Sequence, residues 1–276
     1  MRQNGGEAPS HEAIQVLRQD LGLNDALPIR YGRWAYAAVR GDLGESYRTG
    51  GSIATELFHR LPATLLLAAT ALALAVLAGI PLGVMAAVKR GTWLDSVCRV
   101  LALVGAAVPN YVMAPALMLL FAVKLHWLPA VGYGSLENLI LPAVALSFGT
   151  MAQLMRLTRA SLLEVLSQDY MRTARAKGLS DTTVVWRHGL KNALLPVITV
   201  LGTSMGYLLS GAVIIETIFG WPGIGQFVVT GISQRDYPVV QGFVLYVAVI
   251  FLFVNLAVDV SYRFLDPRLH FDNQPS

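Results

Sequence analysis

Hydrophobic and polar positions follow one another along this chain in long blocks. Five apolar runs contain no Asp, Glu, Lys or Arg. Each run has roughly the length of about 20 residues that a helix needs to cross a hydrocarbon core of about 30 Å, and none alternates with a period of two. The pattern therefore predicts an all-α polytopic membrane protein with five transmembrane helices. The runs are Pro62–Val88, Val100–Val123, Asn138–Met155, Asn192–Ile215 and Tyr237–Val258.

Prolines and small residues inside these runs indicate how the helices pack. Pro109 and Pro115 share the second run and predict a bent helix, which either lines a pathway or packs around a neighbour. Gly202, Gly206 and Ser210 recur at four-residue spacing in the fourth run. Such a face of small residues predicts close helix packing.

The distribution of charged residues along the chain predicts its orientation in the membrane. Only 14% of the residues are charged, against about 25% in a soluble domain. The net charge of +4 does not indicate nucleic-acid binding, because the basic residues flank the apolar runs. Twelve Lys and Arg residues lie in residues 89–99, in residues 156–191 and after the last run, whereas segments 124–137 and 216–236 hold one each. The positive-inside rule places the twelve in the cytoplasm. We therefore expect a multi-pass protein of the inner (plasma) membrane with a cytoplasmic C-terminus and lipid contacts.

Residues 1–61 then form an extracytoplasmic segment ahead of the transmembrane domain, residues 62–276. Ile14, Leu17 and Leu21 recur at helical spacing and predict a short amphipathic helix that Gly22 ends. The segment holds seven basic and seven acidic residues and no apolar leader run. Translocation of such a charged segment ahead of a first span is uncommon. We therefore expect a further transmembrane helix before it in the native gene product.

The chain carries no recognisable catalytic or metal-binding pattern. It has no GxxxxGK[S/T] phosphate-binding loop, a single cysteine, Cys98, and five scattered histidines. No apolar run holds a carboxylate, Lys, Arg or His, and such groups are typical of proton- or ion-coupled transporters. If the protein moves a solute uphill, the energy must come from a partner.

We call residues 156–191 the basic segment, because they hold seven Lys and Arg residues against three acids. The stretch Gln168–Lys177 predicts a helix that stops at Gly178, and Ser180 is a good N-cap for a second helix, Asp181–Leu190. Two short helices joined by a bend predict a rigid knob. The alternative interpretation is an interfacial loop that only sets topology.

These residues resemble the cytoplasmic "EAA" loop of binding-protein-dependent ABC transporter permeases, in Asp169–Ser180 and in Arg187–Pro196. The likeness is to the peptide/nickel branch and, within it, to the first permease type of dipeptide and oligopeptide importers. It spans residues 10–270, and it implies the type I ABC importer permease fold. Other similar segments follow in the expected order: Gly41–Gly44, Pro81–Gly91, Leu139–Pro142, Glu216–Gly225, Arg235–Pro238 and Asp266–Arg268.

The chain departs from the general permease pattern at two places. Arg172, Thr173 and Ala174 occupy the Glu-Ala-Ala positions, and Leu190-Lys191 stands where the pattern has Leu-Pro, a form common in the peptide/nickel branch. Family members also begin with a span before the external helix, in line with the additional helix expected above.

The resemblance implies a coupling role for the basic segment. In the family, this loop docks in a groove of an ATPase, and closure of two ATPases rocks the paired permeases between outward- and inward-open states. The residues implied for docking are Arg172, Thr173, Ala174, Arg175, Lys177, Gly178, Leu179 and Asp181. The residues similar to the family's external gate loop, for which a plain extracellular turn is the alternative, are Phe219, Trp221, Pro222, Gly223 and Gly225.

The implied partners are a second permease subunit, two cytoplasmic ABC ATPases and an extracytoplasmic substrate-binding protein. ATP and Mg²⁺ would be held by the ATPases, so no catalytic residue and no cofactor are expected in this chain. Di- and oligopeptides are the leading substrates, and nickel chelates, glutathione and opines remain open. A stand-alone secondary transporter or channel and a scaffold that carries nothing are the rival classes. The absence of charges inside the apolar runs and the basic segment both argue against the first.

Overall fold

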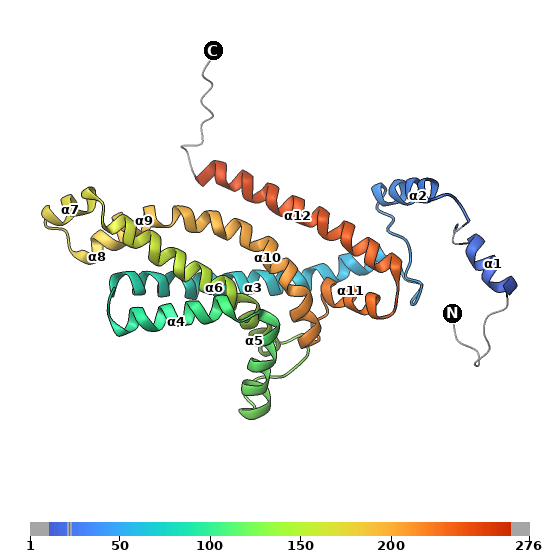
Figure 1. Ribbon diagram of the computed structural model, residues 1–276, viewed down its shortest axis with the longest axis horizontal. Helices are drawn as coiled ribbons and strands as arrows, with labels where there is room; N and C mark the ends of the chain where they lie inside the picture. The colour runs from blue at the N-terminus through green and yellow to red at the C-terminus, as the bar shows by residue number, and fades with distance from the viewer. Residues whose placement is uncertain (1–10, 21, 23, 266–276) are drawn as a thin grey trace, which may run out of the picture. The chain divides into compact units, whose positions relative to one another are not determined.

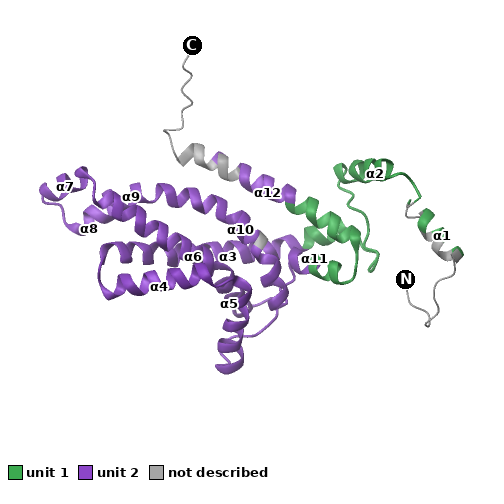
Figure 2. Cartoon of the chain, in the orientation of Figure 1, with its two compact units in different colours: residues 1–59, 228–247 green, residues 60–227, 248–276 purple. Residues whose placement is uncertain are grey.

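The computed structural model describes residues 11–265 except Leu21 and Leu23, and this part of the chain is mainly helical (Figure 1). In the described residues, β pairing is confined to an isolated antiparallel bridge between Glu45 and Ser52. The chain divides into two compact units (Figure 2). Unit 1 comprises residues 1–59 and 228–247, and unit 2 comprises residues 60–227 and 248–276. The all-α fold class predicted from the sequence is confirmed.

The described elements run in the order α1 (His11–Asp20), α2 (Leu27–Val39), α3 (Ile53–Val88), α4 (Trp93–Ala107), α5 (Asn110–Leu117), the π-helical stretch η1 (Met118–Lys124), α6 (Leu136–Leu166), α7 (Asp169–Ala176), α8 (Asp181–Thr183), the π-helical stretch η2 (Val184–Gly189), α9 (Leu190–Ala193), α10 (Leu195–Phe219), α11 (Ile224–Ser233) and α12 (Tyr237–Leu265).

Unit 1 contains the predicted short helix near the N-terminus. Helix α1 ends at Asp20, and Gly22 follows with a φ of +61°. Of the sequence features quoted above, Leu21 and the segment Asp266–Arg268 lie outside the described residues. Helix α2 was not predicted, and it begins with Pro28 in its first turn, where a missing N–H costs nothing.

Within the described residues, helices α3, α6 and the part Tyr237–Leu256 of α12 are each long and apolar enough to cross a membrane. Three further pairs of helices pass the same test together but bend at a short break, which gives up to six candidate spans. The first three predicted runs and the fifth each lie within one helix or bent pair, whereas Asn192–Ile215 begins in one bent pair and ends in the next. The division of the chain into five spans stays a prediction.

The second predicted run is bent, as its two prolines predicted. Helix α4 ends at Ala107, and α5 starts after Pro109, whose ψ of 147° places it outside the helix. The axis turns by 109° at this break. Pro115 lies inside α5, and the backbone widens into η1 directly afterwards. A proline removes a helical hydrogen bond and clashes with the preceding turn, which explains the break.

Helix α6 is the element of unit 2 against which α4, α5, α9 and α10 pack. A Cβ atom on Gly83 of α3 would lie 2.7 Å from the carbonyl oxygen of Met155. One on Gly105 of α4 would lie 2.6 Å from the Cβ of Ala152. Because lipid removes the hydrophobic driving force between helices, such close backbone approach is what holds a membrane bundle together. The buried cluster at the centre of this packing includes Leu67, Ala71, Leu146, Leu208, Ala212 and Trp221.

Candidate functional site

The basic segment begins as a continuation of α6. This helix runs to Leu166, well past the predicted end of its apolar run at Met155, and Ser167 follows it as C-cap. The extension is amphipathic: Leu162 is fully buried, whereas Arg156 and Glu164 are exposed. Residues 156–166 therefore form a helical stem that joins the membrane helix to the two short helices predicted from the sequence.

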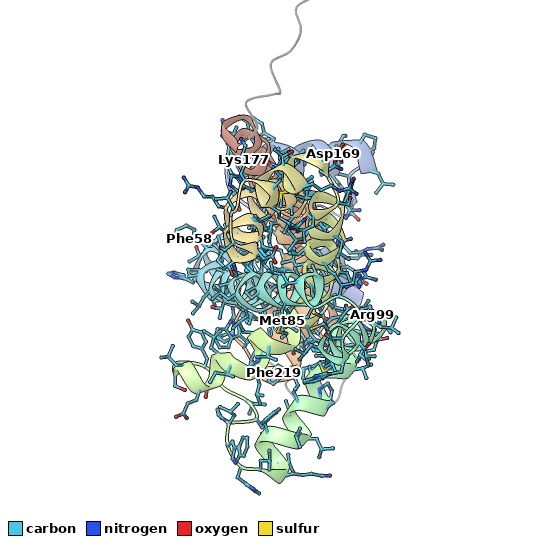
Figure 3. The ribbon with its side chains drawn as sticks, turned by 90° about the vertical axis from the view of Figure 1, so that its left-hand side faces the viewer. Phe58, Met85, Arg99, Asp169, Lys177 and Phe219 are labelled. Carbon is cyan, nitrogen blue, oxygen red and sulfur yellow. The ribbon has the colours of Figure 1, made fainter. Side chains whose placement is uncertain are left out.

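The first predicted short helix is present as α7. Met171 is fully buried and Ala174, one turn later, is half-buried, so these two residues face inward. Arg172 and Arg175 of the same helix are exposed. Asp169 occupies the first turn, where a carboxylate interacts favourably with the helix dipole. Figure 3 shows Asp169 and Lys177 together at one edge of the view, well separated from Phe219.

The bend between the short helices lies at Gly178. Its φ is +82°, a left-handed conformation in which any side chain is strained, although a Cβ there would meet no atom within 4 Å. A glycine is therefore needed here for the left-handed backbone conformation, and not because a neighbouring atom leaves no room for a side chain. Ser180 then accepts a hydrogen bond of 3.3 Å from the backbone N–H of Thr183, as an N-cap does. The predicted stop and cap are both present.

The second short helix differs from the prediction of one regular helix over Asp181–Leu190. Helix α8 passes at Val184 into the π-helical stretch η2, and α9 carries the helical backbone on to Ala193. The wider turn lets both Val184 and Val185 be buried. Gly189 is buried as well, because a Cβ there would lie 3.3 Å from the side chains of Leu162 and Met171. The π stretch thus packs this half of the knob against α6 and α7.

The two halves of the knob meet on its exposed surface through charged side chains. Arg175 Nε donates to Asp181 Oδ1 over 3.2 Å, and their side chains are 41% and 86% exposed. Arg172 Nη1 lies 3.7 Å from Asp169 Oδ1, with 77% and 97% exposed. Exposed pairs of this kind contribute about 0–1 kcal/mol each, so their charges remain available to a partner. Beside them, Leu179 adds an apolar side chain that is 39% exposed.

Of the eight residues implied for docking, seven are exposed and Ala174 is half-buried, and they lie on α7, on the adjoining bend and at the first position of α8. The base of the knob is fixed to the membrane helices by a buried cluster. That cluster combines Val84 and Ala87 of α3 with Leu162 of α6, Val185 and Ala193. The knob therefore has an exposed charged surface and a base packed against two long helices.

We call residues 219–225 the tryptophan loop, and it is not a plain exposed turn. Helix α10 ends at Phe219, and Gly220 caps it with a φ of 63°. Trp221 is 1% exposed, and its indole N–H donates to the backbone oxygen of Ala63 over 2.9 Å. Its ring packs edge-to-face against Tyr133 at 4.7 Å. The loop is therefore fixed to α3 and to the segment before α6, with Phe219 also buried and Pro222 half-buried.

A buried carboxylate organises this loop. Glu216 is fully buried on α10, and its Oε2 accepts hydrogen bonds from the backbone N–H groups of Gly225 at 2.7 Å and Gln226 at 3.1 Å. Thr64 Oγ1 donates to Glu216 Oε1 over 2.5 Å and accepts from the N–H of Ile224 over 3.0 Å. The first N–H groups of α11 are thus satisfied by one carboxylate and one hydroxyl, which also suit the helix dipole.

The glycines of the tryptophan loop make room for this carboxylate. A Cβ on Gly223 would overlap the Glu216 carboxylate, and one on Gly225 would overlap the backbone of Val213. Glu216 was missed in the sequence because the fourth apolar run ends one residue before it, at Ile215, so it was assigned to a loop. Helix α10 carries on through it. A glutamate shortly before a Gly-rich turn and a helix start is the signal that would have found it.

The predicted face of small residues on α10 is in close contact with another helix at its middle residue, Gly206. Gly206 is buried, and a Cβ there would overlap the Phe251 ring of α12. Gly202 is half-buried, and the side chain of Ser210 lies outside the described residues. Gly206 is therefore the member of the set with an observed close contact.

Comparison with known proteins gives consistent similarities. The family described as binding-protein-dependent transport system inner membrane component matches residues 79–271. The glutathione transport system permease protein GsiC of Escherichia coli O6:H1 is 41% identical over 97% of this chain and 87% of that protein. Its counterpart in Salmonella paratyphi A is 40% identical over the same shares.

Two solved structures show the same fold at low identity. An inward-facing structure of the MetNI methionine ABC transporter aligns with a TM-score of 0.63 and 17% identity, over 76% of this chain and 96% of the matched chain. An amino acid ABC transporter solved with histidines aligns with a TM-score of 0.58 and 16% identity, over 78% and 94%.

Proposed function

Because the chain belongs to the family of binding-protein-dependent transport system inner membrane components, and is a permease subunit of an ABC importer, we propose that it forms part of the translocation path for glutathione-sized peptides. The substrate class is supported by relatives at about 40% identity that are named for glutathione transport. Glutathione is therefore the first solute to test, ahead of ordinary dipeptides, nickel chelates and opines.

The protein is a multi-pass component of the inner membrane. We place the basic segment and the C-terminus in the cytoplasm, on the strength of the positive-inside rule. On this orientation, the tryptophan loop lies on the opposite side, where a binding protein delivers substrate. We further propose that the chain pairs with a second, different permease.

The basic segment is the proposed docking site for an ATPase subunit, and ATP hydrolysis is assigned to two such subunits. The observation that carries this assignment is that α7 and its C-cap expose Arg172, Arg175 and Lys177 on a knob whose base is packed against α3 and α6. A ligand shifts a conformational equilibrium only when it binds the two states differently. A knob that moves as a unit transmits that difference to the membrane helices.

The tryptophan loop is the proposed external gate. Its support is the fixed geometry around Glu216, which joins the start of α11 to Thr64 on α3. A loop held by hydrogen bonds to two different helices follows their movement, whereas a plain turn does not.

The test is reconstitution. The chain is co-expressed with a second permease, two ATPases and a binding protein of the same importer, and the complex is placed in proteoliposomes. We expect uptake of radiolabelled glutathione that requires both ATP and the binding protein. Uptake by the chain alone, driven by an ion gradient, would contradict the assignment and favour a secondary transporter. Competition by unlabelled dipeptide or nickel chelate, but not by glutathione, would correct the substrate.

A further inference from the structure

Asp95 and Arg159 form a buried ion pair between α4 and α6. The side chain of Asp95 is 2% exposed and that of Arg159 is 23% exposed. Arg159 Nε donates to Asp95 Oδ1 over 2.7 Å, and Nη2 donates to Oδ2 over 2.9 Å. The backbone N–H of Gly91 adds a third hydrogen bond to Oδ2, at 3.1 Å. Two parallel bonds of this kind fix the orientation of both side chains as well as their distance.

The pair is not needed to bring the two helices together. Gly105 of α4 already meets Ala152 of α6 at a distance that leaves no room for a Cβ. Removing two charges from water is costly, and well-packed apolar residues often stabilise a buried site as well as an ion pair does. A buried pair next to a sufficient packing contact therefore indicates a role in setting one arrangement of the helices.

The position of Arg159 connects this arrangement to the basic segment. Arg159 lies on the helical stem, and α6 continues from it without a break to Leu166, just before α7. The preceding residue, Thr158, is fully buried against Gly83, because a Cβ on that glycine would lie 2.7 Å from the Cβ of Thr158. At this level the stem is therefore in contact with α3 through one residue and with α4 through the next.

We propose that Asp95 and Arg159 are positioning residues that transmit movement of the basic segment to α4. The proposal rests on the ATPase-docking function assigned to that segment above. A displacement of α7 moves the stem as one rod, and the two-pronged ion pair carries α4 with it. Helix α4 leads directly to the 109° break and to α5, which packs against α6 and α10. The pair thus links the docking surface to the bent span.

The experiment compares variants of the reconstituted importer. Arg159→Lys keeps the charge but cannot form two parallel bonds, and Asp95→Asn keeps the shape but removes the charge. The matched control is Arg99→Gln, because Arg99 also approaches Asp95, at 3.7 Å, but its side chain is 58% exposed. For each variant we measure glutathione uptake per ATP hydrolysed, and co-purification of the ATPases.

We expect Arg159→Lys and Asp95→Asn to retain the ATPases but to lower uptake per ATP by about 2-fold to 30-fold, the range seen for residues that carry coupling. Arg99→Gln should leave the ratio unchanged, and the exchange Asp95→Arg with Arg159→Asp should restore part of it. A wild-type ratio in both single variants would overturn the proposal. So would loss of the assembled complex in both, because the pair would then serve assembly alone.

A second measurement needs no substrate. Spin labels at Ala176→Cys on α7 and Trp93→Cys on α4, in a Cys98→Ser background, report the distance between the two helices. We expect that distance to stay constant when ATP is added to the complex, and to change in the Asp95→Asn variant. If the distance between the two spin labels changes with ATP while Asp95 and Arg159 are both present, the proposal is overturned. Failure of the wild-type chain to retain ATPases would instead overturn the docking function itself.

Discussion

Ser46 donates a hydrogen bond of 2.6 Å to the carboxylate of Asp236, which lies 190 residues further along the chain. Both residues are buried in unit 1. The backbone N–H groups of Tyr47 and Arg48 also point to this carboxylate, at 3.2 and 3.4 Å. The residues that follow the Gly41–Gly44 segment are thus joined to the Arg235–Pro238 segment.

The first prediction concerns this contact. Ser46→Ala leaves the buried Asp236 carboxylate with the two backbone N–H groups but without its hydroxyl donor, and a hydrogen bond to a charged group contributes about 1.5–3 kcal/mol. Thermal unfolding in detergent should show the loss, with early proteolysis of residues 228–247. The control is Ser233→Ala, because the Ser233 hydroxyl is exposed and bonds only to Val229 of its own helix. Equal stability of the two variants would show that Asp236 does not depend on Ser46.

The second prediction concerns Glu216. Glu216→Gln replaces one accepting oxygen by an NH₂ group, which cannot accept from the N–H groups of α11 or from Thr64. We expect a loss of about 1–3 kcal/mol in stability and a strong fall in uptake, with membrane insertion retained. Glu137→Gln is the matched control, because Glu137 is exposed in the first turn of α6. Full uptake in the Glu216 variant would remove the tryptophan loop from the transport cycle.

The third prediction separates backbone shape from side-chain contact at Gly178. Gly178→Val forces a β-branched residue into a left-handed conformation, which costs about 1–2 kcal/mol, yet it clashes with no neighbour. The bend should therefore change while the bundle stays intact, so that uptake falls and insertion does not. Gly41→Val is the control, with a φ of +85° and equally open surroundings in unit 1. Unchanged uptake in the Gly178 variant would count against docking at this bend.

The fourth prediction concerns charge at the proposed docking surface. Arg172→Glu breaks only an exposed pair with Asp169, so stability should change by less than about 1 kcal/mol. Retention of the ATPases should nevertheless fall, and the effect should weaken as salt is raised, because exposed charges are screened. Lys89→Glu, a charge reversal at another exposed residue outside the basic segment, should have no such effect. If both reversals act alike, general surface charge and not docking is responsible.

The fifth prediction concerns helix packing at Gly206. Gly206→Ala places a methyl group in the Phe251 ring, and overpacking of this kind typically costs about 1–3 kcal/mol. Adding Phe251→Ala to the same chain should restore much of the loss, because the space is freed. Unfolding of the single and double variants in detergent measures this. A double variant that is less stable than either single change would show that the two residues do not share one contact.

Charge-free runs were sufficient to locate the long helices, because a chain in lipid must satisfy its backbone internally and so becomes helical wherever it is apolar. Local signals were also sufficient at Gly178 and Ser180, where the backbone conformation depends on one residue. The ends of the helices were less predictable. Helix α3 starts at Ile53 and includes Glu56 and His59, since a helix that emerges from the apolar run can continue with polar residues on its surface.

Pairs of residues far apart in sequence could not be predicted. Asp95 and Arg159 each look like an ordinary membrane-flanking charge, and only the packing of α4 on α6 brings them together. Glu216 looks like the first residue of an external loop, although its carboxylate holds the start of α11. In both cases, the residue type is visible in the sequence and its partner is not, because the partner depends on tertiary structure.

The π-helical stretch Val184–Gly189 has a consequence for how this chain tolerates changes in length. A π turn contains about one residue more than an α-helical turn, which is the same as a one-residue insertion in an α-helix. Deleting one residue there would allow regular α-helical spacing. It would also rotate α7 and the Gly178 bend by about 100° relative to α10. The number of residues in η2 therefore sets the direction in which the proposed docking surface faces, and a deletion that leaves every helix intact would still turn that surface away.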